Sequence, residues 1–377
     1  MRPIAIAFSG PRTVAFLEEK DRPLEPGEVR LRTLYSGISA GTELATFRGT
    51  NPHMRKRWDG DLCLFVDDPA HESVQSPASG YPVTAGYEEV GEVVEAGAEV
   101  EGVPLGSVVY GIWGHRTMYV TGADYARERL LPTHVDPLFG IFSHIGATAL
   151  NGILDSAIRL GETVAVFGLG VVGQLVAQLA RLSGAEVIGV DLLSLRLDVA
   201  RQVGIDHVVD ARDGPAAEVI KDLTGGRGAD VCIEASGSAR ALHEAVRSCA
   251  YAAKVVALGF YQGEAQGLHL GEEFHHNRIS IVCSQIGGVA SELQHRWDRL
   301  RLARTFMRFI AQGKLQLRPL ITHVVPATEA PGLFRLLDEQ PSEVLQAVLD
   351  FRLAFPPSLP DEKAAADRVE RREGQGR

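Results

Sequence analysis

The sequence is poor in cysteine, and its four cysteines form no motif. Cys63, Cys232, Cys249 and Cys283 are scattered through 377 residues, and no two of them are spaced C-x-x-C. This pattern argues against a disulfide framework and against a redox or metal motif built on paired cysteines. Because Cys232 and Cys283 lie in apolar, strand-like runs, we expect buried thiols in a reducing cytoplasm.

Long apolar and basic runs are also missing. No apolar stretch has the length and composition we expect of a membrane span, and the first residues, MRPIAIAFSGPRTVAF, lack the pattern of a signal peptide. A net charge of −10 without a long basic run argues against a nucleic-acid partner. The composition, 45% hydrophobic and 23% charged, is that of a globular protein, and the length predicts two domains. We therefore expect a cytoplasmic protein that binds a small molecule.

What the chain does contain is a glycine-rich turn between a strand pattern and a helix pattern. The β-prone run 164–167 leads into Gly168, Gly170 and Gly173 with the spacing G-x-G-x-x-G, and a helical pattern opens at Val171 and Val172. The first glycine would allow the tight turn, the second a close approach to a pyrophosphate, and the third close packing of helix on strand. The phosphates would bind the unpaired amides of the helix N-terminus. A glycine-rich turn that binds no nucleotide is the alternative, and it leaves the agreement of strand, glycines and helix unexplained.

An acidic residue follows at the spacing expected for a ribose contact. Asp191 ends the next apolar run, eighteen residues past Gly173. A carboxylate there can accept hydrogen bonds from both ribose hydroxyls and repel a 2′-phosphate, which predicts NAD rather than NADP. Arg196, Ser236 and Gly259 are further candidates for cofactor binding.

The order of expected elements predicts an α/β fold. Up to about residue 130 the pattern is short β segments ended by glycine and proline, and from about residue 156 strands alternate with amphipathic helices. Such alternation indicates a doubly wound parallel sheet. The division we expect is a β-rich domain at 1–150, a nucleotide-binding domain at 151–290, a return to the first domain at 291–355 and a disordered tail at 356–377.

Several segments together resemble the medium-chain dehydrogenase/reductase superfamily over nearly the whole chain. They are EPGEVRLRTLYSGISAGTEL, TAGYEEVGEVVEAGAEV, GADVCIEASGS and KVVALGFYQG. The resemblance implies a GroES-like β-rich catalytic domain, a Rossmann domain, and hydride transfer between a nicotinamide and an alcohol or carbonyl in the cleft between them. It also implies a homo-oligomer, a dimer or tetramer, with the apolar run 279–283 as a possible pairing edge. The GISAGTEL and GYE segments are similar to the bacteriochlorophyllide hydroxyethyl dehydrogenase branch.

The chain departs from this family at the positions of the catalytic zinc ligands. The family's usual ligands are Cys, His, and Cys or Glu, whereas this chain has Ser39 or Ala40, then Tyr87, then a third position on or near His144. Zinc needs three good protein ligands, and His144 with Glu88 does not reach that number. We therefore expect no zinc and an enzyme that works without it.

Without a metal, side chains must manage the proton of the substrate hydroxyl. Tyr87 and His144 are both candidates for the general acid and base, and the sequence does not choose between them. Ser39 and Thr42 could relay the proton, and Glu88 could orient Tyr87. The alternative is that Tyr87 and His144 only fill the space that the metal left and that Glu88 is a structural carboxylate.

A polar insertion at about 47–81 is the second departure. It has little periodicity, which is typical of a lid, a binding loop or a solvated surface loop. Trp58 in this segment and Glu43 just before it are candidates for substrate binding. The insertion's other possible donors are Arg48, His53, Arg55, Arg57 and His71.

The favoured function is an NAD(H)-dependent dehydrogenase that interconverts a secondary alcohol and a ketone on a sugar, polyol or cyclitol. A hydroxyethyl group on a larger ring is a further possible substrate. A zinc-free quinone or enoyl reductase is an alternative, although NADPH, its usual cofactor in the family, conflicts with Asp191. A non-catalytic NAD-binding protein is the third possibility, and ionisable residues in the expected cleft argue against it.

Overall fold

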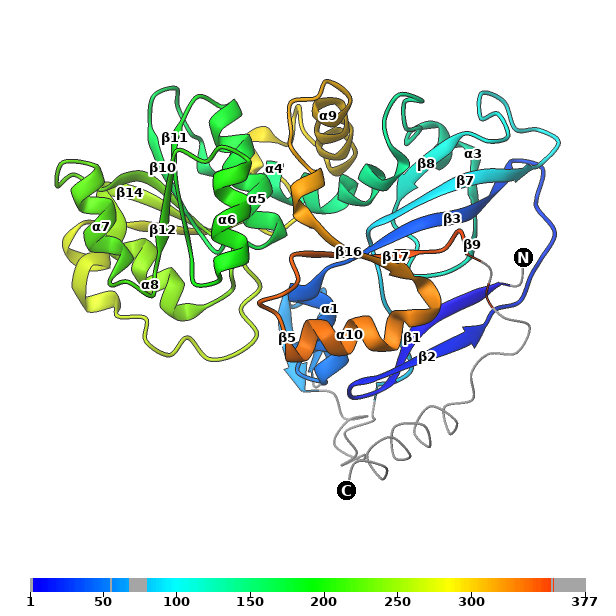
Figure 1. The fold of residues 1–377 in the computed structure, drawn as a ribbon, viewed down its shortest axis with the longest axis horizontal. Coiled ribbons are helices and arrows are strands. Elements are labelled where there is room, and N and C mark those ends of the chain that lie inside the picture. The colour runs from blue at the N-terminus through cyan, green and yellow to red at the C-terminus, as the bar shows by residue number, and fades with distance from the viewer. Residues whose placement is uncertain (1–2, 55, 68–79, 354, 356–377) are drawn as a thin grey trace.

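The fold, taken from a computed structural model, has two main sheets with two helices between them (Figure 1). The structure describes residues 3–54, 56–67, 80–353 and 355. The predicted tail at 356–377 lies outside the described residues, as do Arg55 and His71 of the insertion.

The nucleotide half is a six-stranded parallel sheet in the order β12-β11-β10-β13-β14-β15. The strand order reverses between β10 and β13, which is the switch point at which such folds bind ligands. The predicted alternation of strands and helices is confirmed. Its strands are β10 (Thr163–Phe167), β11 (Glu186–Asp191), β12 (His207–Asp210), β13 (Ala229–Glu234), β14 (Cys249–Ala257) and β15 (Ser280–Cys283). Its helices are α5 (Val171–Leu182), α6 (Ser194–Gln202), α7 (Ala216–Leu223), α8 (Ala239–Ser248) and the short π-helix η3 (Leu270–Phe274).

The β-rich half combines the two ends of the chain. Its larger sheet has the order β16-β17-β3-β7-β8, with β9 also paired to β3. β17 runs antiparallel to β3, so the segment after the parallel sheet returns to the first half of the chain. The members of this sheet are β3 (Glu28–Ile38), β7 (Glu89–Ala96), β8 (Val108–Gly111), β9 (Met118–Gly122), β16 (Ile321–Pro326) and β17 (Gln346–Asp350).

Smaller elements complete this half. β1 (Ile4–Gly10), β2 (Thr13–Glu18) and β6 (Val83–Thr84) form a separate three-stranded sheet. Within the insertion, β4 (Lys56–Asp59) and β5 (Leu64–Asp67) form an antiparallel hairpin that the sequence pattern did not predict. The helices are α1 (Ala40–Arg48), α3 (Ala123–Arg127), α10 (Ala330–Glu339) and the 3-10 turns η1 (Pro52–Met54), η2 (Pro137–Ile141), η4 (Ser291–Leu293), η5 (Arg318–Leu320) and η6 (Ala327–Glu329).

Two helices, α4 (Phe142–Ser156) and α9 (Arg299–Ala311), lie between the sheets (Figure 1). The largest hydrophobic cluster includes Tyr35 and Val90 of the β-rich half, residues of both helices, and the core of the parallel sheet. Residues 137–156 are long and apolar enough to cross a membrane by length and composition, so the expectation that no segment reaches this limit is wrong. Because 72% of that window is buried inside the protein, it is explained as a core helix.

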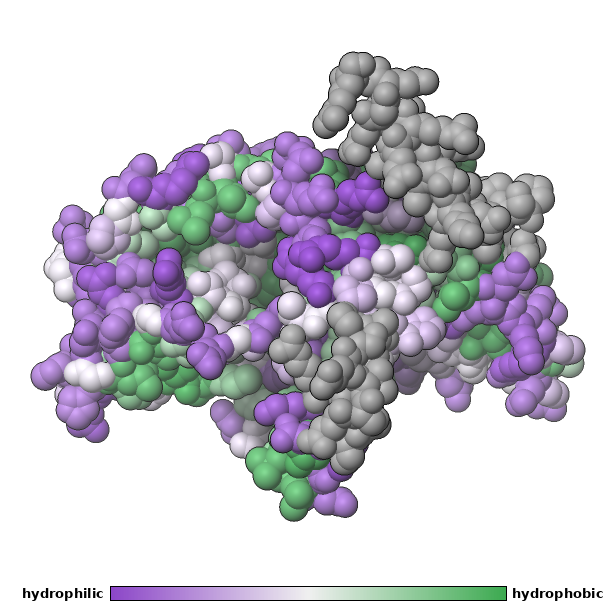
Figure 2. Space-filling view, turned by 90° about the horizontal axis from the view of Figure 1, so that it is seen from below, coloured by the Kyte–Doolittle hydropathy of each residue, from purple (hydrophilic) through white to green (hydrophobic). Residues whose placement is uncertain are grey.

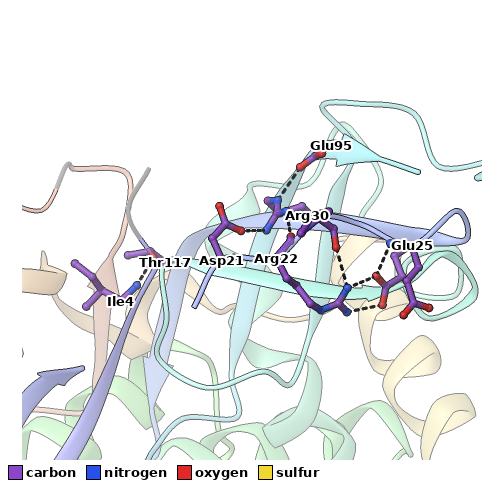
Figure 3. Close-up of polar contacts among 9 residues, drawn as sticks. Ile4, Asp21, Arg22, Glu25, Arg30, Glu95 and Thr117 are labelled. Atoms are coloured by element: carbon purple, nitrogen blue, oxygen red, sulfur yellow. Dashed lines mark hydrogen bonds and ion pairs between the residues drawn. The ribbon is translucent and has the colours of Figure 1, made fainter. Parts of the chain in front are cut away.

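Charged side chains fix the strand edges of the β-rich half. Arg30 on β3 binds Asp21 at 2.6 Å and Glu95 at 2.7 Å, and Arg22 binds Glu28 through both of its terminal nitrogens (Figure 3). Viewed from below, the surface is largely hydrophilic, with apolar residues gathered in separate patches (Figure 2).

The close approach of α4 to α9 requires a glycine, which gives a first prediction. A Cβ on Gly146 would overlap the ring of Phe306, which is fully buried. Gly146→Ala should therefore lower the free energy of unfolding by about 1–3 kcal/mol, the usual range for overpacking. Urea unfolding measures this difference. The matched control is Gly332→Ala in α10, whose Cβ meets nothing within 4 Å and which should be neutral or slightly stabilising. Equal effects in the two variants would contradict the packing argument.

Candidate active site

The three motif glycines are required for three different reasons. Gly168 has φ +86°, and a Cβ there would lie 2.6 Å from the Cβ of Ser236. A Cβ on Gly173 would overlap the carbonyl oxygen of Gly168. Gly170 is the N-cap of α5, and the only atom near its Cβ position is Nη1 of Arg196 at 4.0 Å. This leaves room for a phosphate beside the first amides of α5, at Val171 and Val172.

Asp191 is already a hydrogen-bond acceptor within the protein. Its Oδ2 accepts from the amide of Leu169 at 2.6 Å, and its Oδ1 accepts from the amides of Leu192 and Leu193 at 2.7 and 2.9 Å. Nη1 of Arg196 lies 3.6 Å from Oδ2. A carboxylate offers about four lone-pair sites, so the free capacity for a ribose hydroxyl is on Oδ2. The contact of Asp191 with the ribose hydroxyls stays a prediction.

Ser236 and Gly259 support the turn that follows β13. The amide and hydroxyl of Ser236 donate to Oε1 of Glu234, and the Tyr261 hydroxyl donates to Oε2. Burial and the Glu234 charge raise the pKa of Tyr261. Gly259 packs so close to Gly237 that a Cβ would overlap it. These contacts hold the turn's backbone, which lies against the glycine turn at Gly168.

Tyr87 and His144 are brought together as ring neighbours. Their centroids are 5.2 Å apart in an edge-to-face arrangement, with Tyr87 in the turn before β7 and His144 in the first turn of α4. Burial and the charges of Glu88 and Glu43 raise the pKa of the Tyr87 phenol. The hydroxyls of Ser39 and Thr42 act in the opposite direction as hydrogen-bonding groups to Tyr87. The phenol is therefore held protonated at neutral pH.

His144 is neutral in this environment. Burial, and secondarily the charge of Arg299, lowers its pKa to about 4. An imidazole with this pKa can accept a proton or a hydrogen bond at pH 7, but it is a weak base and does not hold the proton at that pH.

Glu88 lies in the interior of the β-rich half and is fully buried. Its Oε2 accepts from Gln346 at 3.4 Å, and a Cβ on Gly37 would overlap that same oxygen. Burial first, and then the charges of Glu43 and Glu89, raise its pKa well above the ordinary range, against hydrogen bonds from Gln346 and Ser39. Ser39 thus lowers the pKa of both Tyr87 and Glu88, which indicates that its hydroxyl lies near both groups. Oε1 of Glu88 is buried and has no hydrogen-bond partner among the described residues.

Sequence reasoning missed a buried histidine beside these groups. Nε2 of His115 lies 2.8 Å from Oε2 of Glu43, and its Nδ1 lies 2.6 Å from Oγ of Ser36. Ser36 in turn donates to Glu89 at 3.0 Å. The charges of Glu43 and Glu89 raise the pKa of His115 although its burial opposes them. No local motif could have shown this contact, because 72 residues separate Glu43 from His115.

The two substrate-binding candidates lie in different surroundings. Glu43 is 4% exposed, and both of its oxygens are engaged, Oε1 with the amide of Ser39 at 2.8 Å and Oε2 with His115. Its carboxylate is thus directed into the protein. Trp58 on the β4–β5 hairpin is 47% exposed and packs edge-on against Phe65.

The site lies where the two halves of the chain meet. The side chain of Gln262, in the segment after β14, donates to the carbonyl of Gly41 in α1 at 2.9 Å. This contact joins the nucleotide half to the helix that carries Thr42 and Glu43.

Comparisons with known proteins identify the family of the chain. The profile of the family described as "Zinc-binding dehydrogenase" matches residues 171–302. D-guloside 3-dehydrogenase of Shigella flexneri is 30% identical over 349 residues, which cover 92% of this chain and 99% of that relative.

Two solved structures have the same fold. 2R,3R-butanediol dehydrogenase of Bacillus subtilis aligns with a TM-score of 0.72 at 21% identity, covering 92% of this chain and 99% of that one. A zinc-binding dehydrogenase of Sinorhizobium meliloti, solved with bound NADP, aligns with a TM-score of 0.69 at 21% identity, covering 93% and 99%. The chain therefore belongs to the zinc-binding dehydrogenase family, in the medium-chain dehydrogenase/reductase superfamily, and is an NAD(P)-binding dehydrogenase of the alcohol or polyol type.

Proposed function

We propose that this dehydrogenase uses NAD(H), works without zinc, and interconverts a secondary alcohol and a ketone on a sugar, polyol or cyclitol-like compound. The observation that supports the proposal is the edge-to-face contact between Tyr87 and His144, two residues at positions where the family resemblance implies zinc ligands. We infer that residues 1–150 and 291–355 form the catalytic domain, that 151–290 form the nucleotide domain, and that the protein acts in the cytoplasm as a homo-oligomer.

The residues of the nucleotide half fit a dinucleotide. The pyrophosphate would fit in the space beside Gly170 and bind the first amides of α5. The adenosine ribose would lie beside Asp191 and Arg196. When bound, the nicotinamide supplies the hydride acceptor or donor. The negative charge of Asp191 favours NAD, because a 2′-phosphate would meet it at close range.

The residues of the catalytic half do not fit the family's zinc. Ser39 supplies no thiolate and Tyr87 is held as a neutral phenol, which is a poor ligand. Glu88 is directed toward Gln346, which leaves His144 as the one good donor among the expected ligand positions. A proton path made of side chains is therefore the better account of this site.

We assign that path to Tyr87, Ser39 and Glu88. In oxidation the path starts with Glu88 ionised. The phenolic oxygen of Tyr87 accepts the proton of the substrate hydroxyl while its own proton passes to Oγ of Ser39, and the Ser39 proton passes to the Glu88 carboxylate. Tyr87 and Ser39 end neutral, as they began, and Glu88 gains the proton. The raised pKa of Glu88 makes it a competent acceptor, and reduction runs through the same groups in reverse. His144, beside Tyr87, is the alternative base.

The relative named for a guloside supports a ring hydroxyl as the reacting group. Because Glu43 is buried and engaged, we assign it to positioning Ser39 and His115 rather than to contact with substrate. Trp58, which is exposed on the insertion's hairpin, remains our candidate for contact with a sugar ring.

Chelation tests the proposed independence from zinc. Alcohol oxidation by the protein after treatment with EDTA and phenanthroline should retain its full kcat, because no step uses a metal. Steady-state kinetics before and after treatment are the measurement. Loss of turnover that added Zn²⁺ restores would overturn the proposal.

Cofactor choice tests the role of Asp191. The double change Asp191→Ser with Leu192→Arg should raise the ratio of kcat/KM for NADP over NAD by about tenfold or more, since it removes a like charge and adds an opposite one. Asp191→Asn is the matched control, because it removes the charge while keeping an oxygen for the backbone amides. An unchanged ratio in both variants would remove Asp191 from cofactor selection.

Paired variants separate Tyr87 from His144. Tyr87→Phe should lower kcat by about 10²–10⁴ while NADH binding, followed by fluorescence, is preserved. A base must be unprotonated, so if His144 were the base, oxidation would fall as pH drops through its pKa of about 4, with no transition near the ordinary 6.5. Full activity in Tyr87→Phe, together with a large loss in His144→Ala, would assign the proton to His144 instead.

A further inference from the structure

A second group of metal-ligating side chains lies outside the proposed active site. His243 on α8 and Glu272 and Glu273 on η3 place their ligand atoms within 4.8 Å of one another. A fourth donor, Nδ1 of His269, is 3.9 Å from Oε1 of Glu272, and the two histidine rings are 5.0 Å apart. The dehydrogenase reaction proposed above uses none of these residues.

Two atoms of this group are buried without a partner. Nδ1 of His243 and Oε2 of Glu273 are shielded from solvent, and neither has a hydrogen-bond partner in the described part of the chain. A buried polar atom left unpaired costs about 1–3 kcal/mol, so native proteins rarely leave two of them in one place. A cation coordinated by both atoms would satisfy them together.

The local charge also favours a cation. Arg247 lies 3.3 Å from the other oxygen of Glu273, Oε1, and leaves Oε2 free. That arginine is itself paired with Glu244 at 2.6 Å and reaches Glu218 at 4.0 Å. Its positive charge is therefore shared among several carboxylates, and Glu272 and Glu273 keep a net attraction for a metal ion.

We propose that His243, Glu272 and Glu273, with His269 as the fourth ligand, bind a divalent transition metal of the zinc class. Imidazole nitrogens combined with carboxylate oxygens suit Zn²⁺ and Co²⁺, whereas Mg²⁺ and Ca²⁺ prefer oxygen ligands alone. The ion would join α8 to the segment between β14 and β15. Because Gln262 at the start of that segment binds Gly41 of α1, the ion would anchor a connection that reaches the catalytic half.

The test is titration of full-length, untagged protein with Zn²⁺ after removal of metal by EDTA, followed by calorimetry, with the visible absorption of Co²⁺ as a second readout. One ion should bind per chain and raise the melting temperature. His243→Gln and Glu272→Gln should each weaken Zn²⁺ binding at least about tenfold. Mutation of a residue that only supports a metal ligand already lowers metal affinity by about 10–100-fold. Glu272 is included because, unlike Glu273, it does not bind Arg247.

The matched control is His276→Gln, an exposed histidine nearby that is outside the group and should leave Zn²⁺ binding unchanged. Absence of binding, or equal binding in wild type and both ligand variants, would overturn the proposal. The result is independent of the zinc-free reaction. If His243→Gln loses the bound zinc but keeps its turnover, the zinc belongs to this site. If the variant keeps bound zinc and needs it for turnover, the proposed zinc-free reaction is contradicted instead.

Discussion

The burial of three carboxylates close together is the constraint on which the catalytic half depends. Glu43, Glu88 and Glu89 are 0–4% exposed, and a buried carboxylate must be paired, hydrogen-bonded or protonated. Glu43 is paired with His115. Glu89 accepts hydrogen bonds from the Ser36 hydroxyl and, at 2.7 Å, from the amide of Trp113.

Among the described residues no ion pair joins Glu88 to a cation, and burial, followed by the charges of Glu43 and Glu89, raises its pKa well above the ordinary range. Its neighbours are close: a Cβ on Gly37 would overlap its oxygen, and a Cβ on Gly86 would lie 2.6 Å from the amide of His115. Burial, and then the charge of Glu43 among others, raises the pKa of both Glu88 and Tyr87. The protonation state of the candidate acid thus follows from residues that do not touch the substrate.

The nucleotide half could be predicted from the sequence because its signals are local. The glycine turn, the helix that stops before Gly184 and the acid at 191 lie within 24 consecutive residues, and each has a steric or electrostatic reason that spacing alone expresses. Prediction failed where partners are distant or where periodicity is lost. α4 is buried around most of its circumference, so its apolar residues give no clear helical stripe. Within the predicted return segment at 291–355, helix α9 begins at Arg299, where the Asp298 side chain caps it by accepting from the amide of Arg301.

The catalytic half could be predicted only as a set of candidates. The family resemblance placed Ser39, Tyr87 and His144 at the expected ligand positions, but the sequence could not show that Ser39 lowers the pKa of both Tyr87 and Glu88. Nor could it show that His115 pairs with Glu43. Those facts depend on α1, β7 and the loop after β8 meeting in space. The buried carboxylates Glu43 and Glu89 are balanced by the imidazole of His115 and by backbone amides, so a change at these groups alters the proton affinity of the neighbouring Glu88 and Tyr87.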